Sequence, residues 1–557
     1  MTTKPLNGLI KKFFKINLDL GKGEDLIFRI MLKKVFSKKK MVVIEIISYV
    51  CFYTYKCFEM KKFLLFVSII FFTVSCKKSF KKSNQENIQP NIIYVLADDL
   101  GYGDIGVYGQ QNFQTPNLDR LARGGIKFTQ HYSGSTVCAP SRSALMTGQH
   151  TGHTFIRGNS EMGFTLEKEG QYPLADEEVT IAEVLKKAGY STGAFGKWGL
   201  GYPGSEGDPT NQGFDKFYGY NCQRVAHNYY PTHLWDNLEK IPLEGNNGKT
   251  NSTYAPLLIH EKAISFIEKN KDQPFFMFYP SVIPHAELVA PEMYMKKYRG
   301  KYLPEKEYVN KKKHFSSSGE ESKLLNNYSV GGYNSQKESH AAFVAMIHLL
   351  DEQVGQIIDK VHELGIAENT LIIFSSDNGP HLEGGADPNY FDSNGPLRGY
   401  KRDLYEGGIR VPTLAYWPSK ITPGSTSNHI SAFWDFFPTA VELAGINHNM
   451  TEIDGISFLA ELMGKEQQKH DYLYWEFSEK GGRQAVRMEQ WKAVRMNMSK
   501  NPDSPIELYN LDNDAGEKKN VAVQNPKIVL EMEKIMIKEH SASAIFQFEF
   551  EKNKPRN

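Results

Sequence analysis

Short apolar runs alternate with amphipathic stretches along residues 91–374. Runs such as Asn-Ile-Ile-Tyr-Val-Leu-Ala at 91–97 have no polar interruption, which is typical of strands buried on both faces of a parallel sheet. Strand and helix patterns that alternate in this way predict an α/β fold with a mostly parallel central sheet. The expected strands lie at 91–97, 126–128, 191–195, 274–279 and 371–374.

Helices are expected between these strands. Thr180 and Glu183 have the spacing of a capping box, in which each side chain bonds the other residue's backbone N–H. Pro116 suits the first helical position, and glycines stand where each helix should stop. The expected helices span about 116–124, 181–189 and 337–364.

A further helix is expected to begin at Cys138 and to end at Gly148. Pro140 suits its first turn, and Gly148 suits a left-handed C-terminal cap. A helix N-terminus favours a bound anion, because its free N–H groups and its dipole point toward the ligand. A buried structural cysteine beside a helix start is the alternative interpretation of Cys138.

Two stretches look like insertions, and the pattern changes after about residue 425. Residues 217–235 are dense in Tyr, His and Trp, and residues 296–335 have the composition of a solvated loop. Alternating segments at 485–487 and 491–494 predict antiparallel hairpins, followed by a helix near 526–538. We therefore predict a main domain over 91–425 and a smaller α+β subdomain with an antiparallel sheet over 426–545.

The N-terminal residues have the pattern of an export signal. Met60-Lys61-Lys62 precedes an apolar run at 63–74, which is too short to span a bilayer, and Ser75-Cys76 follows. We expect 1–59 to be a non-native upstream extension, 60–75 a signal peptide and 76–90 a tether with lipid on Cys76. These N-terminal features predict an exported bacterial lipoprotein, either periplasmic or at the outer membrane. Its only contact with the membrane would be through the lipid anchor. An ordinary secretory signal with an incidental cysteine is the alternative.

Charge and cysteine content narrow the possible functions. The net charge of the 557 residues is +2, but residues 1–89 carry 18 Lys and Arg against 6 Asp and Glu, so the remainder is acidic. A basic surface for nucleic acid is therefore not expected on the folded part. Of the five cysteines, only Cys138 and Cys222 lie in the main domain, and nothing in their spacing predicts a disulfide.

Polar residues follow several of the expected strands. Asp98, Asp99, Asp377 and Asn378 offer only oxygen ligands, which suit a hard cation such as Ca²⁺ or Mg²⁺. The alternative is that these acids cap helices and form turns. Lys197, His285 and Lys401 each look like ordinary surface or core residues, but close together they would form a site for a dianion.

These residues resemble those of a known family, the formylglycine-dependent, arylsulfatase-like sulfatases, over roughly residues 91–520. Six segments match in order: Asp98-Asp99, Cys138-Ala139-Pro140-Ser141-Arg142, Gly196-Lys197-Trp198, Pro284-His285, Ser376-Asp377-Asn378-Gly379, and Gly399-Tyr400-Lys401 with Glu406-Gly407-Gly408-Ile409-Arg410.

The resemblance implies an alkaline-phosphatase-like fold and hydrolysis of a sulfate ester. It implies that an exported Cys138 is oxidised to formylglycine by a formylglycine-generating or anaerobic sulfatase-maturating enzyme. It also implies Ca²⁺ bound by Asp98, Asp99, Asp377 and Asn378 together with residue 138. Arg142 would hold the modified residue and the part of the site that binds the metal. Lys197, His285 and Lys401 would bind the sulfate ester. We expect Asp377→Ala to abolish turnover and to leave the fold largely intact.

The sequence departs from the family at Gly199, where many members have histidine. His153 and His381 are spare candidates for the base that histidine would supply, although either also suits a substrate contact or a surface position. We expect a sulfated sugar as substrate, because sugars bind flat on aromatic rings and residues 218–235 are rich in them. His227, His381 and Arg398 are the substrate-binding candidates, and Tyr229 and Tyr230 are expected to face the sugar unless the rings pack the loop onto the body.

Two other functions stay open at this point. One is a phosphodiesterase or phosphonate monoester hydrolase on the same scaffold. The other is a non-catalytic glycan-binding lipoprotein, for which Cys138 would stay an unmodified thiol.

Overall fold

The computed structural model describes residues 89–162, 169–246, 251–310, 333–447 and 451–552. The predicted extension at 1–59, the signal peptide at 60–75 and nearly all of the tether at 76–90 lie outside these residues. Residues 311–332 of the predicted loop also lie outside them.

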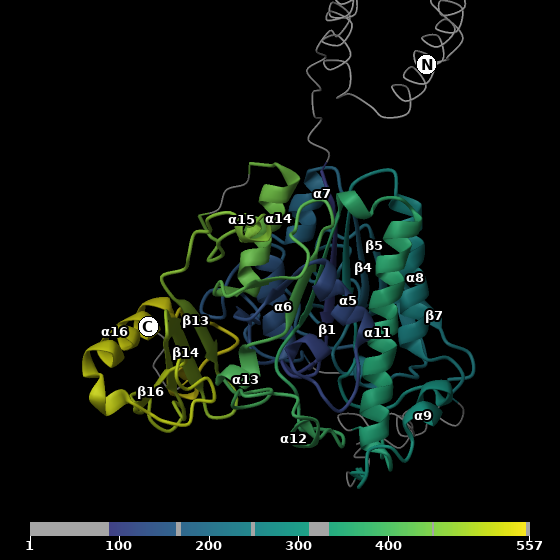
Figure 1. The fold of residues 1–557 in the computed structure, drawn as a ribbon. Coiled ribbons are helices and arrows are strands. Elements are labelled where there is room, and N and C mark those ends of the chain that lie inside the picture. Colours follow the sequence, from purple (N-terminus) through teal and green to yellow (C-terminus); the bar gives the residue numbers. More distant parts are fainter. Residues whose placement is uncertain (1–88, 163–168, 247–250, 311–332, 448–450, 553–557) are drawn as a thin grey trace, which may run out of the picture. The chain divides into compact units, whose positions relative to one another are not determined.

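A ten-stranded sheet forms the centre of the fold (Figure 1). Across the sheet the strands are β11 (Ser425–Ser427), β2 (Ile126–Phe128), β10 (Thr413–Tyr416), β9 (Thr370–Ser376), β1 (Asn91–Ala97), β8 (Phe275–Pro280), β4 (Ser191–Lys197), β5 (Lys216–Tyr220), β6 (His233–Asp236) and β7 (Glu239–Pro242). Strands β9, β1, β8, β4 and β5 are parallel, whereas β10 is antiparallel to β9, and β6 and β7 form an antiparallel edge. The predicted α/β fold with a mostly parallel sheet is confirmed.

The central strand β1 is buried on both faces, as its apolar run predicts. Ile93 and Val95 pack against helices on one face, and Ile92 and Tyr94 pack against helices on the other. The first face is covered by α5 (Pro116–Gly124), α8 (Ala255–Asn270) and α11 (Ser339–Glu363), and the second by α6 (Cys138–Thr147), α7 (Ile181–Lys187) and α14 (Phe436–Ala444) (Figure 1).

The predicted helices are present, with small changes at their ends. Thr180 and Glu183 form the expected capping box, and Gly148 takes the left-handed conformation after α6. Helix α7 ends at Lys187 rather than at residue 189. Among the described residues, α11 alone is long and apolar enough to cross a membrane, but 83% of its most apolar window is buried, as in a core helix.

The prediction of an insertion at 217–235 is wrong at both of its ends. Residues 216–220 form β5, which pairs in parallel with β4, and His233–Asp236 form the edge strand β6. Aromatic residues favour strands as well as binding loops, and Phe217 and Tyr218 are buried against opposite faces of the sheet. The second predicted loop begins later than residue 296, because α9 (Glu292–Tyr298) runs through its first residues.

The C-terminal residues form a four-stranded antiparallel sheet, as predicted (Figure 1). Its strands are β13 (Leu473–Phe477), β14 (Arg483–Met488), β15 (Trp491–Arg495) and β16 (Ile506–Asn510). Helix α16 (Pro526–Glu539) covers one face through Met532 and Met536. The other face packs against Val137 and Ala144 beside and within α6. Helix α14 lies in the range predicted for the C-terminal subdomain, yet it packs into the main core.

Short elements complete the fold. They are β3 (His131–Tyr132), β12 (Ser431–Ala432), α12 (Pro388–Phe391), α13 (Glu406–Ile409), α15 (Leu459–Leu462), α17 (Glu549–Lys552), η1 (Gly106–Tyr108), η2 (Val225–His227), η3 (Ala367–Asn369), η4 (Phe433–Asp435) and η5 (Ala522–Gln524).

A buried ion pair joins the C-terminal sheet to the main core. Lys492 of β15 lies 2.9 Å from Glu406 of α13, and neither side chain is exposed. Burial acts to raise the pKa of Glu406, but Lys492, Arg410 and Arg487 outweigh it and hold that pKa at about 2. Loss of one partner would leave an uncompensated buried charge, which typically costs about 3–5 kcal/mol.

A second link is a histidine pair near the end of α16. The rings of His150 and His153 stack with their centroids 4.2 Å apart. His153 Nδ1 lies 2.8 Å from Asp454 Oδ1, and His150 Nε2 lies 3.1 Å from Glu539 Oε2. These contacts are those of a residue that stabilises the fold. His153 does not line the cavity that contains Cys138.

The pairing of His153 predicts a pH-dependent contribution to stability. The hydrogen bond with Asp454 raises the pKa of His153, with burial opposing and Glu539 adding to the rise. The stabilisation is therefore fully present below the unfolded-state pKa of about 6.5 and is lost as the pH rises through the higher folded-state value. We expect His153→Gln to lower the Tm by about 1–3 °C near pH 5.5 and by much less at pH 9.

Thermal unfolding of wild type and variant at several pH values checks this expectation. His362→Gln is a suitable control, because the partner of His362 is the Tyr416 hydroxyl rather than a carboxylate. A Tm difference for His153→Gln that is equal at both ends of the pH range would contradict the expectation.

Candidate active site

Four oxygen-bearing side chains meet where β1 and β9 end. Asp98 and Asp99 follow β1 directly, and Asp377 and Asn378 follow β9, its parallel neighbour. Asp99 adopts a positive φ of 64°, and its N–H donates to Asp377 Oδ1 at 3.1 Å. Asn378 Nδ2 donates to Asp99 Oδ1 at 2.7 Å. All four residues are buried, so the parallel pairing brings the predicted set together away from solvent.

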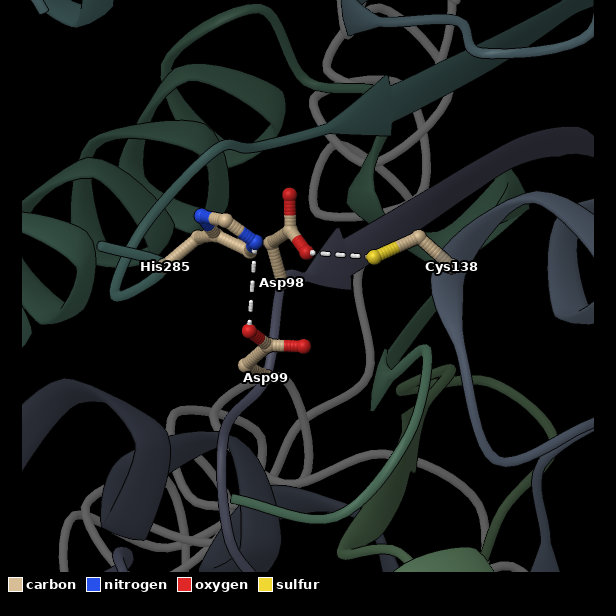
Figure 2. Close-up of side chains that lie close together, drawn as sticks. All are labelled: Asp98, Asp99, Cys138 and His285. Carbon is tan, nitrogen blue, oxygen red and sulfur yellow. Dashed lines mark hydrogen bonds and ion pairs between the residues drawn. The ribbon is translucent and has the colours of Figure 1, made fainter. Parts of the chain in front are cut away.

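Cys138 is the first residue of α6 and points at this cluster (Figure 2). Its Sγ lies 3.2 Å from Asp98 Oδ1 and 3.5 Å from Lys197 Nζ, at the end of β4. Burial, with the charges of Asp377 and Asp98, raises the pKa of the thiol well above its usual value. An unmodified Cys138 is therefore protonated at neutral pH and is a weak nucleophile.

Arg142 stands one turn further along α6 and binds two of the acids. Its Nη2 lies 2.8 Å from Asp377 Oδ2 and 3.5 Å from Asp98 Oδ2. Its Nη1 donates to the carbonyl oxygen of Lys197. Lys197 Nζ in turn lies 2.6 Å from Asp98 Oδ2. Arg142 therefore connects α6, β4 and the end of β9 in one rigid arrangement.

Lys401 and His285 approach the cluster from the other side. Lys401 Nζ lies 2.8 Å from Asp99 Oδ2 and 3.1 Å from His285 Nε2. His285 Nδ1 faces the carbonyl oxygen of Ala286, so Nδ1 carries the proton and Nε2 accepts from Lys401. Burial, followed by the charge of Lys401, lowers the pKa of His285. The imidazole is therefore neutral in this arrangement.

The acidic cluster fits a hard cation. Asn378 Oδ1 is buried and has no hydrogen-bond partner among the described residues, as expected of an oxygen that is a metal ligand. Ligand atoms of Asp98, Asp99, Cys138 and His285 lie within 4.8 Å of one another (Figure 2). Burial, and then the charge of Asp98, raise the pKa of Asp377 to about 6. A bound cation would lower this pKa again, because it would stabilise the carboxylate.

A polar cavity of about 160 Å³ contains Cys138 in its wall. Its lining is Cys138, Asn159, Glu161, Gln171, Gln223, Arg224, His227, His285, Tyr333, Lys401 and Arg402. A larger cavity of about 1220 Å³ lies beside Trp491 and α16 in the C-terminal part. Cys138, His285 and Lys401 do not line that cavity, so size alone does not identify the reactive site.

His227 lines the cavity, whereas its tyrosine neighbours pack against the body of the protein. Its ring stacks on His285 with centroids 4.8 Å apart, and it lines the cavity. Tyr229 is fully buried, and its hydroxyl donates to the carbonyl oxygens of Val282 and His285. Tyr230 packs on Tyr254. The expectation that Tyr229 faces a sugar is wrong, because its hydroxyl fixes the backbone around His285.

The two remaining candidates have different surroundings. His381 is buried 5.6 Å from the His285 ring, and its Nδ1 accepts from the Glu383 N–H. Its Nε2 therefore carries the proton, and it has no partner among the described residues. Arg398 does not line the cavity. Its guanidinium lies over the Tyr405 ring and donates to Glu517 O, so its contacts are those of a residue that stabilises the C-terminal junction.

Other cavity residues were not predicted from the sequence. Asn159 Oδ1 accepts from the Ala139 N–H at 3.0 Å and so caps the start of α6. Gln223 and Tyr333 line the cavity from loops that carry no recognisable motif. Arg224 forms an ion pair with Glu161, and this pair too depends on two distant loops meeting. Periodicity does not reveal such contacts.

Two family models and several known proteins match this chain. Residues 90–446 match the family model described as Sulfatase, and residues 399–542 match N-sulphoglucosamine sulphohydrolase, C-terminal. Arylsulfatase A of Homo sapiens is 30% identical over 509 residues, covering 82% of this chain and 89% of that protein. N-acetylgalactosamine-6-sulfatase of Homo sapiens is 31% identical over 392 residues, covering 67% and 66%.

Solved structures agree on the fold. Ps i-CgsB, solved in complex with k-i-k-neocarrahexaose, has a TM-score of 0.66 at 27% identity, covering 83% of this chain and 96% of that one. The phosphonate monoester hydrolase of Agrobacterium radiobacter has a TM-score of 0.55 at 20% identity, covering 81% and 95%, a likeness that shows the fold alone.

Proposed function

The chain belongs to the sulfatase family, and from this premise we propose that it removes sulfate from a sulfated carbohydrate, with an oxidised Cys138 as the attacking residue. One observation carries the proposal. Cys138 Sγ lies beside the ion pair of Asp98 and Lys197 at a helix N-terminus, in the wall of a polar cavity.

The proposed modification is formylglycine, made by a separate maturing enzyme of the formylglycine-generating or anaerobic sulfatase-maturating kind. The raised pKa of the Cys138 thiol supports it, because the encoded side chain is poorly suited to attack sulfur itself. A hydrated aldehyde at this position supplies two hydroxyls on one carbon, one to attack sulfur and one to expel sulfate afterwards.

The proposed cofactor is Ca²⁺, held by Asp98, Asp99, Asp377 and Asn378 with the modified residue 138. The all-oxygen donor set of these four side chains and the unpartnered Asn378 Oδ1 support this choice. A divalent cation there would supply positive charge to polarise a sulfate oxygen and to favour deprotonation of the attacking hydroxyl. Arg142 holds Asp377 and Asp98 in place for that role.

The remaining cations have separable roles. Lys197 Nζ lies near residue 138, and we assign to it the stabilisation of negative charge that develops during attack. Lys401 faces the cavity beside His285, whose Nε2 accepts from it. Because His285 offers a lone pair at Nε2, Lys401 is the member of the pair that has hydrogens to offer. We therefore assign donation to the leaving oxygen to Lys401, and the positioning of Lys401 to His285.

The carbohydrate part of the proposal rests on the cavity and on one relative. Polar and aromatic side chains such as His227, Arg224 and Tyr333 surround the space next to Cys138. Ps i-CgsB, which shares the fold at 27% identity, was solved with an oligosaccharide.

A side-by-side assay of sulfate and phosphate esters tests the function. Purified protein is given defined sulfated mono- and oligosaccharides, an aryl sulfate, and the matching phosphate and phosphonate esters. We expect sulfate release, fastest from one sulfated sugar. Faster hydrolysis of the phosphorus esters would instead identify the phosphonate or phosphodiester alternative. Glycan binding without any ester hydrolysis would identify a binding protein.

We expect His227 to distinguish a sugar from a simple sulfate ester. His227→Phe keeps the stack on His285 and removes the ring nitrogens, so kcat/KM for the preferred glycan should fall about 10-fold. The same variant should barely change turnover of a small aryl sulfate, which lacks the sugar hydroxyls. Kinetics on both substrates measure the difference.

His227→Ala is the paired variant, because it also removes the stack on His285. A larger loss in His227→Ala than in His227→Phe on the aryl sulfate would measure the value of that stack. Unchanged glycan kinetics in His227→Phe would show that His227 packs against His285 without contacting the sugar.

A further inference from the structure

Gln223 has a buried amide nitrogen that no described residue pairs with. The residue lies between β5 and η2 and is 7% exposed. Its Nε2 has no hydrogen-bond partner among the described residues. A buried N–H group without a partner is unfavourable, so most such groups in folded proteins are paired with protein, water or a ligand.

The backbone holds this amide beside the reactive cluster. Gln223 N–H donates to Gln171 Oε1 at 3.2 Å, which fixes the start of the side chain. Gly199, two residues after Lys197, has a φ of +80°, and its N–H donates to Asn221 O. A Cβ built on Gly199 would lie 2.7 Å from Gln223 Nε2. The absence of a side chain at residue 199 therefore leaves the space that the Gln223 amide occupies.

Gln223 also shares the cavity of Cys138, and its donor differs from the neighbouring ones. Lys197 Nζ is bound to Asp98, and Lys401 Nζ is bound to Asp99 and His285. Each ammonium has three N–H groups, so these contacts still leave a hydrogen for a substrate. The Gln223 amide differs because it is neutral and has no hydrogen-bond partner among the described residues, so it is available to an oxygen acceptor that enters the cavity.

We propose that Gln223 binds the substrate by donating a hydrogen bond from Nε2 to an oxygen of the sulfate group beside Cys138. This inference rests on the proposed function and deepens it. It makes Gln223 a residue that selects a tetrahedral oxyanion without adding another charge to the cavity.

Gln223→Leu is the first test, because it removes the donor at similar size. We expect kcat/KM to fall about 10- to 100-fold on an aryl sulfate and on a sulfated sugar alike, the usual effect of losing a hydrogen bond to a charged group. The Tm should not fall, because Nε2 makes no hydrogen bond to any of the described residues. Gln223→Glu, which keeps the shape and repels an anion, should lose at least as much activity.

Gln212→Leu is the matched control. Gln212 is also buried, at 1% exposed, but it lies outside the cavity, and its Nε2 donates to Glu206 O at 2.9 Å. Its replacement should lower the Tm and leave kcat/KM of the folded enzyme near that of wild type. A Gln223→Leu variant that behaves in this way, with lower Tm and unchanged kcat/KM, would overturn the proposal.

Binding of inorganic sulfate, measured by calorimetry, separates this inference from the proposed function. We expect wild type to bind the ion about 10-fold or more tightly than Gln223→Leu does. Equal affinity would overturn the role of Gln223 whatever the catalytic data show. Wild-type protein that hydrolyses no ester, yet binds sulfate through Gln223, would overturn the proposed function and support the contact.

Discussion

Cys138→Ala should abolish ester hydrolysis, with a loss of about 10⁴-fold or more, because it removes the attacking residue itself. The fold should persist, since among the described residues the hydrogen bonds of the buried Sγ go to Asp98 and Lys197, which pair with each other without it. Turnover of the preferred sulfate ester, together with the Tm, measures the two effects separately.

Mass spectrometry tests the chemical form of the same residue. The peptide that contains residue 138 should be lighter by roughly eighteen daltons than the encoded peptide and should react with hydrazides, if Cys138 is converted to an aldehyde. In a host that does not oxidise serine, Cys138→Ser should attack once and remain sulfated, because it has no second hydroxyl to expel the product. Full activity with an unmodified thiol at residue 138 would contradict the proposed mechanism.

Cys222→Ala is the matched control for these experiments. Cys222 is the other buried free cysteine of the described residues, and it packs in the core on the α8 and α11 side of the sheet. Its peptide should have the encoded mass, and its replacement should leave turnover near the wild-type value.

Asp377→Asn should have the next largest effect, a loss of about 10³-fold in turnover together with loss of bound metal. The amide keeps the shape of the side chain and an oxygen for the Asp99 N–H, but it removes a charge from the predicted cation site. Metal content after dialysis and the shift of Tm on adding Ca²⁺ are the measurements.

Asp377→Ala should differ from Asp377→Asn in stability. Arg142 is fully buried and has its closest carboxylate contact with Asp377, so truncation leaves this cation with Asp98 at 3.5 Å. Removing one partner of a buried ion pair typically costs about 3–5 kcal/mol. The expectation from sequence that the fold would stay largely intact is therefore replaced by an expected fall in Tm.

Asp351→Asn controls for the loss of a buried acid. Asp351 accepts from the backbone N–H groups at the start of α5 and is not part of the acidic cluster, so its replacement should lower stability but not metal content. Full activity in metal-stripped wild type, or unchanged metal content in Asp377→Asn, would contradict the predicted site.

Residues that directly follow regular elements could be placed from the sequence. Asp98 and Asp377 end neighbouring parallel strands, and such strands present their carboxyl ends at one edge of a sheet. Cys138 could be placed because Pro140 and Gly148 mark the two ends of its helix. Local chemistry determines these positions, so little knowledge of the rest of the fold was needed.

Residues on long connections could not be placed in the same way. Tyr229 and His227 are two positions apart, yet they have different surroundings. The Tyr229 hydroxyl binds backbone carbonyl groups, whereas the His227 ring lines the cavity. Arg398 precedes the Gly399-Tyr400-Lys401 segment but turns toward Tyr405 and Glu517. In each case the outcome depends on which distant segment packs against the loop, which periodicity does not record.

The packing around α6 also bears on when Cys138 can be reached during synthesis of the chain. Cys138 is 1% exposed, and Val137 and Ala144 share a core with Trp475 and Val494. Trp475 binds Ser133 O across 342 residues of chain, so this wall of the site closes only after nearly the whole polypeptide has been made. If Cys138 is oxidised by a separate enzyme, as proposed, an enzyme that must enclose the residue would have to act before the last hairpins dock. A molecule that folds first would then keep its thiol, and the yield of active protein would depend on the relative rates of modification and of C-terminal folding.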